Sequence, residues 1–220
     1  LAALDYRRRT GRGQYIDMSQ YEAAMQNLAP ALIDYFASGR VLGPKANASE
    51  RYAPHGAYRC ADEDGNERWI AIAVADDAQW RAMLTALDAK STDTRFASAA
   101  GRMNNPAALD EFVNSMTRTR SAHELTTALQ AAGVAAYPVE NCVDIHQDEN
   151  LEAFGFWHWL EHKEMGASPY EGLEHRMSRT PGTLRGAAPI LGQDNDEIFG
   201  TMLSLGADEI EQLKKENVIF

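Results

Sequence analysis

The sequence lacks the residues and runs that would assign it at once to several common classes of protein. Only two cysteines, Cys60 and Cys142, occur among its 220 residues, and neither belongs to a CxxC or Cys/His spacing. This usage predicts neither a disulfide framework nor a zinc site, and it fits a reducing, cytoplasmic setting. No stretch is apolar and uncharged for long enough to cross a bilayer, so we expect no membrane partner.

Positive charge does not balance the negative charge, because 21 Lys and Arg residues stand against 32 Asp and Glu residues and the formal net charge is -11. Such a balance argues against a nucleic-acid-binding surface, and we predict no nucleic-acid partner. A local basic cluster stands out against this background, formed by Arg7, Arg8, Arg9 and Arg12. We interpret it as cations near a helix C-terminus, where they interact favourably with the dipole, and contact with an anionic ligand is the minority interpretation.

Motifs for catalysis and metal binding are missing too. The glycines of Gly11-Arg12-Gly13 are too few for a phosphate loop and lead from helix to strand, the reverse of a dinucleotide fingerprint. No G-x-S-x-G elbow occurs. His158 and His162 would lie roughly 13 Å apart on a strand, at ~3.3 Å per residue, which is too far to share one metal ion. We therefore assign no catalytic residue and no metal site.

The sequence does contain a regular apolar pattern, with 45% hydrophobic and 24% charged residues, which is typical of a globular protein with a sizeable core. Helical spacing recurs in three places, at residues 80–87, 109–116 and 125–132. The third helix is expected to begin with a capping box of Ser121 and Glu124 and to end at Gly133.

Strands and further helices can be placed around these three. Residues 69–74 are apolar on both faces and predict a central strand, whereas Pro138 puts residues 134–139 at a sheet edge. Further strands are expected at residues 15–18, 156–162 and 174–177. Further helices are expected from Ser19, as the cap, to about Gly39 with an interruption at Pro30, and at residues 194–205 and 208–217.

One long segment, residues 39–56, has no convincing period. It exceeds the ~12–15 residues above which a structureless connection is usually functional or disordered. Because polar and aromatic side chains such as Asn47, Arg51, Tyr52 and His55 stand among its helix breakers, we predict an ordered binding loop.

The stretch Thr10-Gly11-Arg12-Gly13-Gln14-Tyr15-Ile16-Asp17-Met18-Ser19, followed by Glu22-Ala23, resembles a known signature. It is similar to the interior motif R-x-T-G-x-G-Q-x-V-D-V-S-x-x-E-A of the class III coenzyme A transferases, the CaiB/BaiF family. Further similarities lie at residues 52–60, 69–74, 129–134 and 188–192. They follow the family's order over essentially the whole chain. The resemblance implies a C-terminal portion that lacks the family's N-terminal half.

The resemblance implies transfer of coenzyme A between carboxylic acids through an aspartyl-CoA intermediate. The family's nucleophilic aspartate lies upstream of the signature, so this chain alone is expected to be inactive. The substrates would be an acyl-CoA and a carboxylic acid, and no cofactor is expected. The loop occupies the place of a family loop that covers the reacting aspartate, which suggests substrate-binding roles for Asn47, Arg51, Tyr52, Ala53 and His55.

The implied fold is α/β, with an inserted small α/β domain and parts of a doubly wound large domain, in a homodimer of interlocked rings. Residues 1–57 would belong to the large domain and the linker with the active-site loop, and residues 58–165 would form the small domain. Residues 166–220 would be an extended crossover and C-terminal helices. The partner would be a second copy, together with the missing N-terminal half or a complementary chain.

Two alternatives remain open. The α-methylacyl-CoA racemases of the same family abstract a proton next to the thioester carbonyl, with residues that also lie mostly upstream. The other alternative is a non-catalytic fragment or assembly partner.

Overall fold

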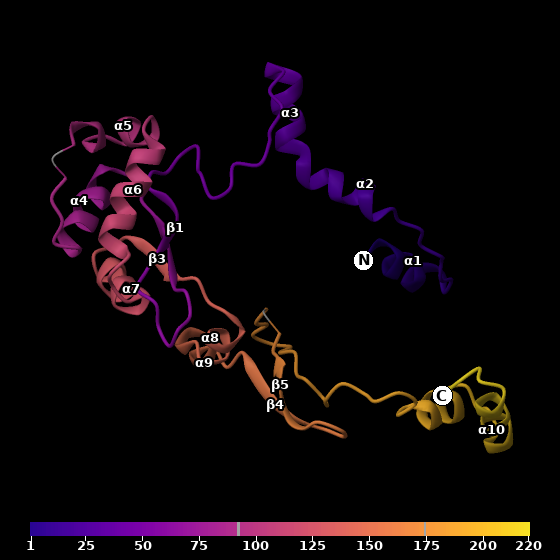
Figure 1. The fold of residues 1–220 in the computed structure, drawn as a ribbon. Helices are drawn as coiled ribbons and strands as arrows, with labels where there is room; N and C mark the ends of the chain where they lie inside the picture. Colours follow the sequence, from indigo (N-terminus) through magenta and orange to yellow (C-terminus); the bar gives the residue numbers. More distant parts are fainter. Residues whose placement is uncertain (92, 174) are drawn as a thin grey trace. The chain divides into compact units, whose positions relative to one another are not determined.

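The computed structural model describes residues 1–91, 93–173 and 175–220. Its tertiary contacts divide the chain into two compact units, Leu1–Pro138 and Val139–Phe220 (Figure 1). The domain boundaries inferred from the family resemblance stay a prediction. Among the described residues, no helix has the length and apolar character needed to cross a membrane.

The sheet of the first unit has three antiparallel strands in the order β1-β2-β3. They are β1 (His55–Arg59), β2 (Trp69–Ala73) and β3 (Ala135–Pro138). Tyr58 pairs with Ile70, and Ile72 pairs with Ala136. The predicted central strand at residues 69–74 and the predicted edge strand with Pro138 are therefore confirmed.

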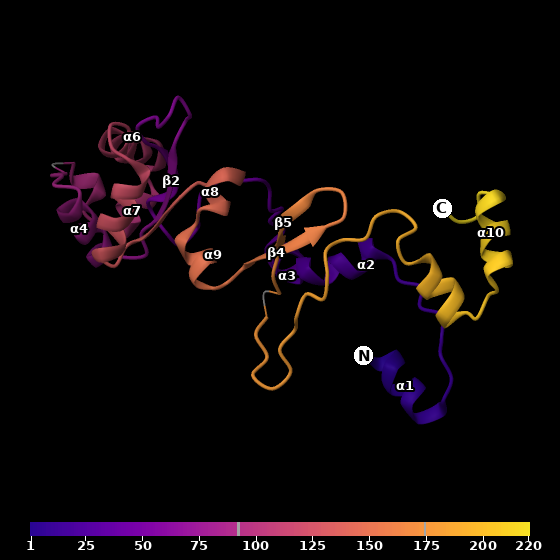
Figure 2. The ribbon, with the colours of Figure 1, turned by 90° about the horizontal axis from the view of Figure 1, so that it is seen from below.

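The helices and short turns of the first unit are α1 (Ala2–Thr10), α2 (Gln20–Met25), η1 (Gln26–Leu28), α3 (Ala29–Ser38), α4 (Asp77–Ala86), η2 (Thr94–Phe96), α5 (Ala99–Met103), α6 (Pro106–Thr117) and α7 (Ala122–Ala131). Figures 1 and 2 show α4, α6 and α7 gathered on one side of the sheet. Their predicted apolar stripes supply Trp80, Met83, Leu109, Val113, Leu125 and Leu129 to the core.

Only one face of β2 is buried. Ile70 and Ile72 point into the core, with exposed fractions of 0% and 2%, whereas Trp69 on the other face is 37% exposed. The apolar character of both faces, from which the central position was predicted, thus does not translate into burial of both. The alternation is that of an antiparallel sheet covered by helices on one side.

The N-terminal segment follows the predicted helices but not the predicted strand. The hydroxyl of Ser19 accepts a hydrogen bond from the backbone N–H of Glu22, which confirms the cap. The turn η1 interrupts the helix before Pro30, and Gly39 ends it with a φ of 74°. Residues 15–18 form no strand, because no neighbour among the described residues supplies the hydrogen-bonded partner that a strand requires.

The expected capping box at the start of α7 is wrong. The hydroxyl of Ser121 donates a 2.8 Å hydrogen bond to the carboxylate of Glu63, on the turn between β1 and β2, and caps no backbone N–H of α7. The predicted end of this helix is confirmed, since Gly133 has a φ of 76°. The side chain of Ser121 is thus oriented toward a partner distant in the sequence and accepts no hydrogen bond from the N–H groups of its own helix.

The second unit contains α8 (Cys142–His146), α9 (Glu149–Ala153), β4 (Trp157–His162), β5 (Gly166–Glu171), the π-helix η3 (Asp196–Met202) and α10 (Ala207–Lys215). Strands β4 and β5 form a two-stranded antiparallel sheet, which confirms the strand predicted at residues 156–162. Of the strand predicted at 174–177, Glu174 lies outside the described residues, and 175–177 form no strand. The two closing helices are present, although the first is a π-helix.

Candidate functional site

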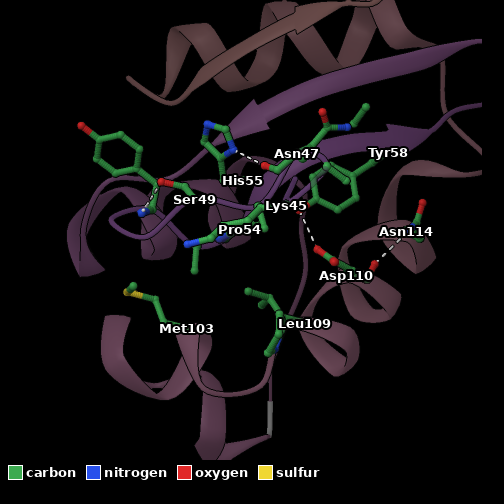
Figure 3. A pocket seen from close by; sticks show the side chains of 17 residues that line it. Lys45, Asn47, Ser49, Pro54, His55, Tyr58, Met103, Leu109, Asp110 and Asn114 are labelled. Carbon is green, nitrogen blue, oxygen red and sulfur yellow. Dashed lines mark hydrogen bonds between the residues drawn. The ribbon is translucent and has the colours of Figure 1, made fainter. Parts of the chain in front are cut away.

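The long loop before β1 closes a pocket of about 350 Å³ against the N-terminal part of α6 (Figure 3). The loop and β1 contribute residues 45–49 and 52–58, and the helical side contributes Met103, Pro106, Leu109, Asp110 and Asn114. All of these residues belong to the first unit. The pocket therefore combines a polar, loop-borne wall with a helical wall that includes the buried Leu109.

The imidazole ring of His55 is held in place by a hydrogen bond to the backbone of the loop. Its Nδ1 lies 2.5 Å from the carbonyl oxygen of Asn47 (Figure 3). Since a carbonyl oxygen only accepts, Nδ1 donates, and in the neutral ring Nε2 is left as an acceptor. The ring also stacks on Tyr52, with centroids 6.2 Å apart and planes inclined by 23°. The loop thus presents a phenol and an imidazole as one pair.

A second polar group lies where β1 meets α6. The hydroxyl of Tyr58 donates to Asp110 Oδ1 at 2.9 Å. Burial, and secondarily the negative charge of Asp110, raises the pKa of Tyr58 well above its ordinary value. Asn114 is fixed at both ends of its amide, because it donates to the Asp110 carbonyl and accepts from the backbone N–H of Arg59. This side of the pocket is pre-organised.

An exposed chain of charges connects the loop to α3. Arg40 pairs with Asp34 at 2.6 Å and with Glu50 at 3.0 Å, and Glu50 in turn contacts the ammonium of Lys45. Hydrogen bonding from Lys45, followed by the charge of Arg40, lowers the pKa of Glu50. Lys45 lines the pocket and is its one ammonium group among the lining residues that the structure describes.

The end of the loop is docked onto the sheet. Ala53 donates its N–H to the carbonyl of Val74 at 3.2 Å, and Val74 donates to the carbonyl of Pro54 at 2.9 Å. The carbonyl of Ala53 accepts a 2.8 Å hydrogen bond from Nε of the buried Arg102. These three bonds fix the backbone between Tyr52 and His55.

Four of the five residues predicted to bind substrate line this pocket, namely Asn47, Tyr52, Ala53 and His55. Arg51 does not line it, and its backbone N–H donates to the hydroxyl of Ser49. The binding roles stay predictions.

Sequence reasoning missed the contribution of Lys45, Tyr58, Asp110 and Asn114 to this pocket. One signal was present, because Asp110 and Asn114 are four residues apart on a predicted helix and must share a face.

The pocket offers hydrogen-bond donors, acceptors and one ammonium beside an apolar wall. Such a set suits the recognition of a carboxylate or a carbonyl oxygen on a small organic acid. Within the described part of the chain, no three His, Cys, Asp or Glu side chains lie together as they would to hold a metal ion.

Comparison with known proteins identifies a family to which this chain is similar. The family model of CoA-transferase family III matches residues 1–195. A probable CoA-transferase of Mycobacterium tuberculosis is 30% identical, with 100% of this chain and 27% of that protein covered. The succinyl-CoA–D-citramalate CoA-transferase of Chloroflexus aurantiacus is 27% identical over 100% of this chain and 54% of its own length. Against this second relative, the chain spans about half the length.

A solved structure agrees with the sequence comparisons. The crystal structure of a CaiB/BaiF family protein from Brucella suis superimposes with a TM-score of 0.78 at 27% identity, covering 91% of this chain and 51% of that one. The α/β fold of the family type is thereby confirmed, whereas the ring-shaped dimer stays a prediction. By the family match over most of its length, the chain belongs to the class III CoA-transferases, the CaiB/BaiF family.

Proposed function

We propose that this chain is part of an enzyme that moves coenzyme A between carboxylic acids, and that its pocket holds the acyl portion of the substrates. The observation that carries the proposal is the pocket lined by residues 45–49 and 52–58 and by the helical residues opposite them, all inside the segment matched to the family. The reacting carboxylate would be an aspartate supplied by a part of the protein outside this sequence. The enzyme would need no cofactor, because coenzyme A is itself a substrate.

The proposed chemistry divides the exchange into covalent steps. The enzyme's carboxylate attacks the thioester carbonyl of the donor, which expels the CoA thiolate and forms a mixed anhydride. The thiolate then attacks the carbonyl of the enzyme's aspartyl group, so the donor acid leaves as a carboxylate and an aspartyl-CoA thioester remains. The acceptor carboxylate runs the same two steps in reverse and leaves as the new acyl-CoA.

We further propose that the acids are dicarboxylic. Succinyl-CoA, D-citramalate, glutarate and mesaconate appear in the names of similar transferases. One carboxyl group of such an acid reacts, and the other needs a partner in the site. The ammonium of Lys45 and the amide of Asn47, both on the pocket wall, are suited to that second carboxylate.

The remaining features of the proposal concern assembly and location. A cytoplasmic homodimer, completed by the N-terminal half or by a complementary chain, would enclose the pocket and exclude water from the anhydride. A Chloroflexus aurantiacus relative is named as the alpha subunit of a succinyl-CoA–L-malate CoA-transferase and another as its beta subunit. These names make a complementary chain a reasonable partner.

The test uses the protein purified as its gene encodes it. Labelled succinate is incubated with succinyl-CoA, and entry of the label into succinyl-CoA is followed. Unlabelled dicarboxylic acids are then offered as acceptors, and the loss of labelled succinyl-CoA and the appearance of new CoA thioesters are measured. Transfer of CoA to an acceptor supports the proposal. Loss of an α-deuteron from a 2-methylacyl-CoA without CoA exchange would instead identify a racemase. If the protein shows neither activity, the alternative of a non-catalytic assembly partner is favoured.

A further inference from the structure

Arg102, on the short helix α5, is completely buried, with an exposed fraction of 0%. Its guanidinium makes contacts in three directions. Nε donates to the carbonyl of Ala53 at 2.8 Å, Nη1 donates to the carbonyl of Phe96 at 3.1 Å, and Nη2 lies 2.9 Å from Asp77 Oδ1. The group also lies over the ring of Trp80, 5.2 Å from its centroid. One side chain thus joins the pocket loop, η2 and α4.

Burying this charge is costly, and these contacts offset the cost. The two bonds to carbonyl oxygens have hydrogen-bond geometry, whereas the contact of Nη2 with Asp77 is an ion pair by distance without that geometry. Backbone geometry places the residue accurately. A Cβ on the preceding Gly101 would lie 2.2 Å from the carbonyl oxygen of Arg95, so only glycine allows α5 to pack against η2 at this distance. Because α5 and η2 approach so closely, the guanidinium of Arg102 lies within hydrogen-bond distance of the carbonyl of Phe96.

The contact with Ala53 has a specific consequence for the pocket. In the sequence, Ala53 and Pro54 connect Tyr52 to His55, and the rings of Tyr52 and His55 stack on each other. Two of the hydrogen bonds that dock this dipeptide run to Val74, and the third, to the Ala53 carbonyl, comes from Arg102. A rotation of the peptide plane at Ala53 would break that third bond and would re-aim Tyr52 relative to His55.

We propose that Arg102 is a positioning residue that sets the orientation of the Tyr52–His55 pair from outside the pocket. It lines no part of the pocket itself, so it acts through the Ala53 carbonyl. The kinetic consequence rests on the proposed CoA transfer, whereas the structural consequence does not. A purely structural role would change stability and leave the pair in place.

The test compares Arg102→Lys with the matched control Arg95→Lys in the protein purified as its gene encodes it. Arg95 also pairs with an aspartate, Asp93, and lies over Phe96, but among the described residues it makes no hydrogen bond or ion pair with the loop. Lysine keeps the charge and loses the planar fork that spans Ala53, Phe96 and Asp77. Hydrogen exchange at the Ala53 and Val74 amides and the NMR signals of the His55 ring report the loop directly.

We expect Arg102→Lys to shift the His55 ring signals and to speed exchange at Ala53 and Val74, while Arg95→Lys changes neither. Measured per folded molecule, kcat/KM for the acceptor acid falls by up to about 100-fold in Arg102→Lys, as misplacement by about 1 Å can cause, with most of the change in KM. Unchanged His55 signals and unchanged exchange in folded Arg102→Lys would overturn the proposal.

A second variant tests the same contact from the side of Asp77. If Arg102→Lys does not fold, Asp77→Asn removes the ion-pair partner, whose side chain is 44% exposed, and leaves the arginine in place. It should move the same His55 signals by a smaller amount, and no movement would again overturn the proposal. If the wild-type protein transfers no CoA, the proposed function fails, while the NMR and exchange measurements still decide the role of Arg102.

Discussion

The hydroxyl of Tyr58 donates a 2.9 Å hydrogen bond to the carboxylate of Asp110 and so joins β1 to α6 at the edge of the pocket. Tyr58 is 1% exposed, whereas Asp110 is exposed. Water can therefore hydrate the carboxylate if the hydroxyl is removed, but it cannot reach the phenol. The pair couples the stability of the sheet to the protonation of one tyrosine.

Replacing Tyr58 with phenylalanine should lower the free energy of unfolding by ~1 kcal/mol at neutral pH, through loss of the hydrogen bond. Burial raises the pKa of Tyr58 above the ordinary value of about 10. The unfolded chain therefore loses this proton at a lower pH than the folded protein. The stabilising contribution is present below about pH 10 and is lost as the pH rises further. Urea unfolding from pH 7 to 11 measures both effects.

The control for this variant is Tyr21→Phe, since Tyr21 is 77% exposed. It should leave both the stability and its alkaline decline unchanged. In Tyr58→Phe the decline above about pH 10 should be shallower than in the wild type. An equal slope would contradict the assigned pKa direction.

The two cysteines should differ strongly in reactivity. Burial, with a smaller effect from Glu63, raises the pKa of Cys60 to about 11, whereas Cys142 is exposed. Because the thiolate is the nucleophile, a maleimide should modify Cys142 in the native protein and reach Cys60 only after unfolding. Mass spectrometry of digested, labelled protein measures this. Rapid native labelling of Cys60 would show that the core opens around β1.

The same pKa predicts a pH effect on stability. The unfolded thiol ionises near 9 and the folded one near 11. The contribution of Cys60 is thus present below about pH 9 and disappears between about pH 9 and 11. Cys60→Ala should make the stability less dependent on pH in that window, and Cys142→Ala serves as the control.

Replacing Glu50 with glutamine should loosen the pocket loop with little effect on global unfolding, because its ion pairs with Arg40 and Lys45 are solvent-exposed. The amide of Ala48, which donates to the carbonyl of Lys45, should exchange faster in the variant. Lys45 and Arg40 lower the pKa of Glu50, so the wild-type protection is present above about pH 4.5 and is lost as the pH falls below it. Hydrogen exchange followed by NMR measures both.

Glu22→Gln is the matched control, since Glu22 makes no ion pair among the described residues. High salt should reproduce the Glu50→Gln result in the wild type through screening. Protection of Ala48 that is equal in wild type and Glu50→Gln would show that the loop is held by its backbone contacts alone.

Gly101→Ala should destabilise the first unit, because the new methyl group would lie 2.2 Å from the carbonyl oxygen of Arg95. Overpacking of this kind costs about 1–3 kcal/mol. The control is Gly43→Ala, where nothing lies within 4 Å of the added Cβ. Thermal unfolding of the two variants measures the difference. Equal melting temperatures would contradict the close packing of α5 on η2.

Much of the fold could be predicted because the signals were local. The spacing of Trp80, Met83 and Leu87 defines a buried helix face whatever the rest of the chain does. Gly133 readily adopts the positive φ that ends a helix, and Pro138 lacks the N–H that a central strand would need. The ordered loop was predictable from its length and its breakers. Four residues singled out there line the pocket.

What could not be predicted depends on partners distant in the sequence. Ser121 has the local pattern of a cap, but its hydroxyl donates a hydrogen bond to Glu63, which lies 58 residues away in the sequence. Residues 15–18 have a strand pattern and no strand to pair with among the described residues. Arg102 was passed over entirely, because nothing in its neighbours indicates that a carbonyl 49 residues earlier requires a donor.

The order of the sheet also has a consequence for how the chain folds. Strands β1 and β2 are neighbours in the sequence, joined by residues 60–68. The other edge of β2 is paired by β3, which follows only after α4, α5, α6 and α7. Until β3 arrives, the apolar segment Trp69-Ile70-Ala71-Ile72-Ala73 leaves that edge open, with no charge and no proline to block it. A polypeptide that ends before Ala135, or a ribosome that pauses there, should yield a species that associates edge to edge.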